Sequence, residues 1–165
     1  MIERGEFAEL HCLSNYSFLR GASHPEELVY KASDLGYSAI AITDECSYSG
    51  LVKAHVAAKQ CGIKLIVGAE FFVDMTHGEE KNSVENIIML APTRQAYGQL
   101  SAFISKIRRK NQKGNSYLCH EDCQIGLSDC LILWSPELQD IDIQVIIGQK
   151  LKTIFQHFWI TLELF

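Results

Sequence analysis

Short hydrophobic runs alternate with helix-like segments along the first half of this chain. Three of these runs, residues 7–11, 39–44 and 64–70, end on His11, Asp44 and Glu70. Such alternation is typical of a parallel α/β sheet, and barrels built in this way collect their chemistry at the carboxyl ends of the strands. We therefore expect the three side chains to converge on one mouth. Taken singly, Asp44 and Glu70 are also explained as caps of the segments that follow them, and His11 as a histidine of the core.

The composition argues against some classes of function but does not identify the function. A chain of 165 residues has the length of one domain, and 47% hydrophobic with 21% charged residues is ordinary for a globular protein. The net charge of −5 argues against autonomous, non-specific nucleic-acid binding, which needs a basic surface. There is no cationic, apolar signal segment and no apolar run of about 18 residues, so the sequence predicts no secretion and no membrane partner. We expect a cytoplasmic protein whose six cysteines are reduced thiols.

The spacing of apolar residues predicts the secondary structure. Strands are expected over residues 9–13, 39–43, 65–73, 86–91, 130–134 and 158–164. Helices are expected over residues 24–35, 48–60, 93–109 and 141–155. The first helix is predicted to start with a capping box formed by Ser23 and Glu26 and to stop at Gly36. The second is predicted to bury the side that carries Leu51, Val52, His55, Val56 and Ala58.

Two segments resemble a known family. They are AELHCLSNYSFLRGASHPEELV (residues 8–29) and LGYSAIAITDECSYSGLVKAHVAAKQCGIKLIVGAEF (residues 35–71). Both closely resemble the N-terminal PHP (polymerase and histidinol phosphatase) domain of bacterial C-family DNA polymerases, in particular the error-prone alpha-subunit branch. The resemblance implies an α/β fold: a distorted PHP-type (βα)7 barrel related to the TIM barrel. It also implies that residues 1–165 form a single PHP domain, truncated before the last unit of the barrel.

The metal motifs of that family are only partly present. Active PHP domains open with Asp/Glu-Leu-His-x-His-Ser, and here residues 9–14 retain His11 but have Leu13 in place of the second histidine. The family motif Thr-Asp-His is Thr43-Asp44-Glu45, so another imidazole is lost, whereas Gly-x-Glu survives with Glu70.

The resemblance therefore implies a degenerate metal site and assigns no catalytic residue. Its ligands would be His11, Asp44 and Glu70, with Glu9 or Glu45 as further candidates. Oxygen ligands favour hard ions, so we expect at most weak binding of Mg²⁺ or Mn²⁺ and no firmly held cofactor.

Two weaker patterns occur in the second half of the chain. A basic cluster comprises Lys106, Arg108, Arg109, Lys110 and Lys113. It is explained either as a contact to a nucleic-acid backbone in a larger assembly or as a solvated helix end, and both hypotheses stay open. The second pattern, Cys119-His120-x-x-Cys123, resembles half of a metal site, but no second pair completes the four ligands of structural zinc. We interpret its cysteines as incidental thiols.

The resemblance implies the N-terminal PHP part of an error-prone DNA polymerase that acts in DNA replication and damage-tolerant repair synthesis. Its role there would be that of a structural scaffold. The partners would be the remainder of a C-family polymerase, or a separate chain that carries it, and DNA through the parent enzyme. The parent nucleotidyltransferase activity is not expected of this chain, which lacks the required aspartates and surrounding basic residues. A stand-alone metal-dependent phosphoesterase of the PHP superfamily and an inactive gene remnant remain alternatives.

Overall fold

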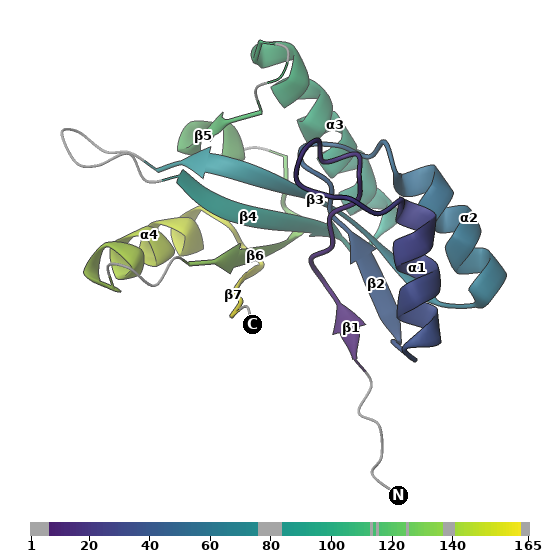
Figure 1. Cartoon of the computed structure of the whole chain (residues 1–165). Coiled ribbons are helices and arrows are strands. Elements are labelled where there is room, and N and C mark those ends of the chain that lie inside the picture. Colours follow the sequence, from purple (N-terminus) through teal and green to yellow (C-terminus); the bar gives the residue numbers. More distant parts are fainter. Residues whose placement is uncertain are drawn as a thin grey trace, which may run out of the picture. The chain divides into compact units, whose positions relative to one another are not determined.

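The computed structural model describes residues 7–75, 84–112, 114, 116–124, 126–136 and 141–162 (Figure 1). The chain divides into two compact units, Met1–Ala69 and Glu70–Phe165. Strand β3 (Lys64–Asp74) passes from the first unit into the second. In the described part of the chain, no helix is both long and apolar enough to cross a membrane.

The first unit is a parallel sheet with two helices. Strand β1 (Ala8–Glu9) pairs with β2 (Ala39–Ile42), and β2 pairs with the first part of β3, in each case in parallel. Helix α1 (Pro25–Asp34) follows β1, and helix α2 (Leu51–Cys61) follows β2. The two helices pack side by side (Figure 1). This unit has the alternating parallel arrangement that the sequence predicts.

Helix α1 begins one residue later than expected. Its N-cap is His24, whose backbone N–H donates to the carboxylate of Glu27 at 2.8 Å, so the capping box predicted over residues 23–26 is wrong. Pro25 stands in the first turn, where its missing N–H removes no helical hydrogen bond. At the other end, Gly36 adopts a φ of +76°, which agrees with the predicted end of the helix.

Helix α2 buries small side chains, and most of its predicted buried side is wrong. Its buried residues are Ala54, Ala57 and Ala58, which pack with residues of α1 and β2. Val52 and Val56 are 74% and 50% exposed. The helix carries apolar residues on more than one side, and the alanine side allows the closest approach to its neighbours. Hydrophobicity alone could not identify that side.

The second unit contains a mixed sheet. Strand β4 (Val84–Ala91) pairs antiparallel with β6 (Leu131–Ser135), and β6 pairs in parallel with β7 (Phe158–Ile160). Strand β5 (Leu118–Cys119) pairs in parallel with the end of β3. The antiparallel pair departs from the parallel sheet that the alternation predicts. It is possible because the connection from β4 to β6 is not a simple crossover: it contains a helix, β5 and the 3-10 helix η1 (His120–Gln124).

Two helices complete the second unit, and both were predicted within a few residues. Helix α3 (Arg94–Lys110) is capped by Thr93, whose hydroxyl oxygen accepts a hydrogen bond from the Ala96 N–H at 3.1 Å. Its buried residues recur at helical spacing: Ala96, Leu100, Phe103 and Ile107. Helix α4 (Ile141–Ile154) lies between β6 and β7 in the chain and buries Ile147 and Leu151.

The buried pair of Trp134 and Glu85 yields a stability prediction. The indole N–H of Trp134 donates to the Glu85 carboxylate at 2.9 Å, and both residues are buried. The substitution Trp134→Phe retains a ring but removes this donor, so we expect it to lower the free energy of unfolding by about 1–3 kcal/mol in urea denaturation. Trp159→Phe, at a residue that is 48% exposed, is the matched control and should change it by less than about 0.5 kcal/mol. Equal losses in the two variants would contradict the prediction.

Candidate functional site

Asp44 lies two residues after the end of β2 and forms a buried hydrogen-bond network with the loop that precedes α1. Its carboxylate accepts hydrogen bonds from the Ser14 N–H at 2.8 Å, the Ser14 hydroxyl at 2.6 Å and the Ser17 hydroxyl at 2.7 Å. The residue is only 1% exposed. A buried carboxylate is tolerated when its oxygens are hydrogen-bonded. Asp44 therefore anchors this loop to the end of β2.

The loop turns tightly around this network. A Cβ atom at Gly21 would lie 2.0 Å from the Ser14 carbonyl oxygen, so only glycine allows this approach. Leu19 adopts a φ of +61°, in the left-handed region that costs a non-glycine residue about 1–2 kcal/mol. The Ser17 hydroxyl oxygen also accepts a hydrogen bond from the Glu45 N–H at 3.0 Å. The network around Asp44 thus stabilises a strained backbone.

The segment after β1 is held beside the end of β2. Strand β1 ends at Glu9, earlier than predicted, but the Thr43 N–H still donates to the Cys12 carbonyl at 2.9 Å, and the Cys12 N–H donates to the Thr43 hydroxyl at 3.0 Å. Burial, with smaller contributions from the carboxylates of Glu9 and Asp44, raises the pKa of the Cys12 thiol to about 11. Cys12 is therefore a protonated thiol at neutral pH.

Other candidate ligands of the first unit have protein partners. The Glu9 carboxylate accepts a hydrogen bond from the His11 backbone N–H at 3.0 Å. His11 itself is half-buried. Glu45 forms an ion pair with Arg20 at 3.5 Å. An ion held by either Glu9 or Glu45 would have to compete with these contacts.

Glu70 lies in the second unit, on β3. It is fully buried, and its carboxylate accepts a hydrogen bond from the Asn86 side-chain amide on β4 at 3.1 Å. Like Asp44, it is a buried carboxylate with a protein donor.

The candidate metal ligands are thus distributed over both units: His11 and Asp44 belong to the first and Glu70 to the second. Among the residues that the structure describes, no three His, Cys, Asp or Glu side chains are grouped closely enough to hold a metal ion. A single ion shared by His11, Asp44 and Glu70 stays a prediction. The role of Ser14 and Ser17 is not apparent from the sequence, where the only signal is a pair of hydroxyls three residues apart.

Two lysines of the basic cluster, both on α3, contact a buried acid. The Lys110 ammonium donates to the Asp122 carboxylate at 2.6 Å, and the Lys106 ammonium lies 3.8 Å from the other carboxylate oxygen. Burial by itself would raise the pKa of Asp122, but hydrogen bonds from Lys110 and Cys119 outweigh it and lower the pKa. The same hydrogen bond raises the pKa of Lys110. These two lysines therefore neutralise an internal carboxylate.

The other basic residues are placed differently. Arg108 and Arg109 are exposed, whereas Lys113 lies outside the described residues. Their contact with nucleic acid, like that of Lys106 and Lys110, stays a prediction.

The two cysteines near η1 have raised pKa values. Burial and a hydrogen bond with Asp122 raise the pKa of Cys119, and burial raises the pKa of Cys123 to about 12. Among the described residues, no group of three His, Cys, Asp or Glu side chains could hold a metal ion, and the interpretation of these cysteines as incidental thiols stays a prediction.

Comparison with known proteins assigns the family. The family model described as PHP domain matches residues 9–129. The chain belongs to the PHP domain family. This PHP chain is 48% identical over 158 residues, 95% of its length, to the error-prone DNA polymerase of Idiomarina loihiensis, and 46% identical over 160 residues, 94% of its length, to that of Saccharophagus degradans. It spans 14% of the length of each of these curated relatives.

A solved structure supports the fold. A two-domain protein from Bacteroides vulgatus that contains a predicted PHP-like metal-dependent phosphoesterase aligns with 87% of this PHP chain and 41% of its own, with a TM-score of 0.51 and 15% identity. At that identity the likeness shows the fold alone. It confirms the predicted α/β fold of the PHP type.

Removal of the Asp44 carboxylate should destabilise the protein. Asp44→Ala leaves the buried donors of Ser14 and Ser17 without their acceptor, so we expect a loss of about 2–4 kcal/mol in the free energy of unfolding. Ser17→Ala removes one donor and should cost about 1–2 kcal/mol. The control Ser49→Ala, at an exposed hydroxyl, should change it by less than about 0.5 kcal/mol. Wild-type stability of Asp44→Ala would refute the anchoring role.

The buried Asp122 predicts a dependence of stability on pH. Its pKa is lower in the folded than in the unfolded protein, so its contribution is present above the unfolded value of about 3.9 and is lost as pH falls through the folded value. Asp122→Asn should therefore be less stable than the wild type at pH 7, and the difference should shrink below about pH 4. The control Asp34→Asn changes an exposed acid. A stability gap for Asp122→Asn that stays constant from pH 7 to pH 2.5 would show that proton linkage is absent.

Proposed function

We propose that this chain is the PHP domain of an error-prone DNA polymerase, comprising residues 1–165, and that it acts as a structural scaffold for the rest of that enzyme. One observation carries the proposal: 48% identity over 95% of the chain to a curated polymerase of which it spans only 14%. The fold of the PHP type agrees with it. The setting would be DNA replication and damage-tolerant repair synthesis in the cytoplasm, with DNA bound through the parent enzyme.

The bonding of the carboxylates supports a scaffold role over a metal-dependent reaction. Asp44 accepts hydrogen bonds from two serines, Glu70 accepts one from Asn86, and Glu45 pairs with Arg20. Protein donors thus hold the oxygens that a PHP metal centre would use, and Leu13 stands where the family has an imidazole. The mostly oxygen ligands among His11, Asp44 and Glu70 fit at most a weakly bound Mg²⁺ or Mn²⁺. We therefore assign no catalytic step to the chain, and nucleotidyl transfer belongs to the remainder of the polymerase.

The proposal is tested by complementation. The probe is the Idiomarina loihiensis polymerase without the 158-residue region that this chain matches. We expect the present chain to bind this truncated polymerase, to raise its melting temperature and to restore primer extension, while showing no primer extension alone. Failure to bind would refute the proposal.

A second assay distinguishes the scaffold from a stand-alone phosphoesterase. The chain alone is incubated with Mn²⁺ and a generic phosphomonoester, and no turnover is expected. His11→Ala is the informative variant because Asp44 also anchors a loop, and His55→Ala on the exposed side of α2 is its control. Turnover that His11→Ala abolishes and His55→Ala retains would favour the phosphoesterase.

A further inference from the structure

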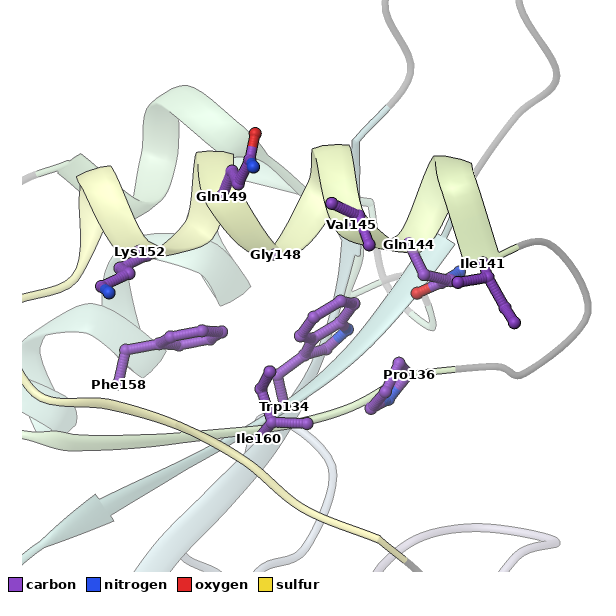
Figure 2. Close-up of a pocket in the computed structure, with 10 residues that line it drawn as sticks. All are labelled: Trp134, Pro136, Ile141, Gln144, Val145, Gly148, Gln149, Lys152, Phe158 and Ile160. Carbon is purple, nitrogen blue, oxygen red and sulfur yellow. The ribbon is translucent and has the colours of Figure 1, made fainter.

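An open apolar groove lies between α4 and the β6–β7 pair of the second unit (Figure 2). Its volume is about 370 Å³. Trp134 of β6 and the side chains of Phe158 and Ile160 from β7 line it from the sheet, and Val145 and Gly148 line it from α4. The residues that α4 contributes run from position 141 to position 152 at helical spacing, so the groove follows about three turns of that helix.

The floor of the groove is held firmly. A Cβ atom at Gly148 would lie 2.7 Å from the Trp134 ring, so the α4 backbone packs directly on the indole. The Trp134 ring stacks with Phe158 at 6.1 Å between centroids, and its N–H donates to the buried Glu85. The indole is thus fixed from three directions, which keeps the groove preformed.

The walls are apolar and exposed to solvent. Ile147 and Leu151 of α4 are buried, yet Ile141 and Val145 on the groove side are 70% and 52% exposed. Ile160 of β7 is 60% exposed. A helix that is apolar on more than one side is typical of a helix covered on more than one side, and contiguous exposed apolar surface marks an interaction site.

We propose that this groove binds the apolar face of a helix from the polymerase region that the longer relatives possess. The inference rests on the proposed function, because the chain spans 14% of those relatives and most of their length is available to supply the helix. Sheet geometry favours a helix as occupant: β6 and β7 are parallel, and helices over neighbouring parallel strands lie side by side on a sheet face. The space beside α4 over β7 has that position.

Charge specifies the occupant further. Lys152 lies at one end of the groove, next to Phe158, and the other lining residues carry no charge (Figure 2). An aliphatic helix face that ends in a carboxylate would bury its side chains on Val145 and Ile160 and pair with Lys152.

A matched pair of substitutions on α4 tests the proposal. Val145 lines the groove, whereas the neighbouring Ile146 does not and is 65% exposed. The full chain is bound to the truncated Idiomarina loihiensis polymerase described above, and the Kd is measured by biolayer interferometry. Val145→Asp should weaken binding at least about tenfold, because it buries an unpaired charge, whereas Ile146→Asp should change Kd less than about twofold. Circular dichroism checks that both variants are folded.

The possible outcomes are distinct. Equal Kd values for the two variants, with wild-type binding intact, would overturn the groove as the docking site and leave the proposed function standing. Absence of wild-type binding would overturn both. If Val145→Asp abolished self-association of the chain in analytical ultracentrifugation without changing the Kd for the polymerase, the groove would be an interface between two copies, and the proposal would be wrong.

Discussion

The carboxylate of Asp44 must be satisfied inside the protein because the residue is almost completely buried. Its donors, Ser14 and Ser17, stand 30 and 27 residues earlier in the chain, so the bonds close a long loop at the end of β2. The close approach at Gly21 and the left-handed Leu19 lie within the segment that these bonds anchor. The Asp44 carboxylate thus anchors the loop that follows the first metal motif of the family.

The elements with strong local signals were predicted well. Residues of β3, α3 and α4 lie within one or two positions of the expected bounds, since long apolar patterns and caps such as Thr93 are local. The two-residue strand β5 and the turn η1 were missed because they depend on pairing with β3 and on Asp122. The candidate metal ligands could be identified from sequence motifs. The hydrogen-bond donors of Asp44 could not, because its contacts with Ser14 and Ser17 join residues that are far apart in the sequence.

Tertiary contacts also determine the role of the basic residues at the end of α3. In the sequence, Lys106 and Lys110 belong to a cationic stretch that suggests phosphate binding. In the structure, both approach the buried Asp122, which follows α3 by more than ten residues. Part of the positive charge therefore stabilises the second unit, and less of it is available to an external anion. Sequence charge is thus a poor measure of surface charge wherever a buried acid lies nearby.

The buried acids of this protein have hydrogen-bond partners within the protein, whereas several of its apolar side chains are exposed to solvent. The buried acids Asp44, Glu70 and Asp122 bond to protein donors. Apolar side chains of α4 and β7, in contrast, are exposed around a preformed groove. Burial of this exposed hydrophobic surface would lower the free energy, so the groove is a part of the second unit that is suited to association with another protein.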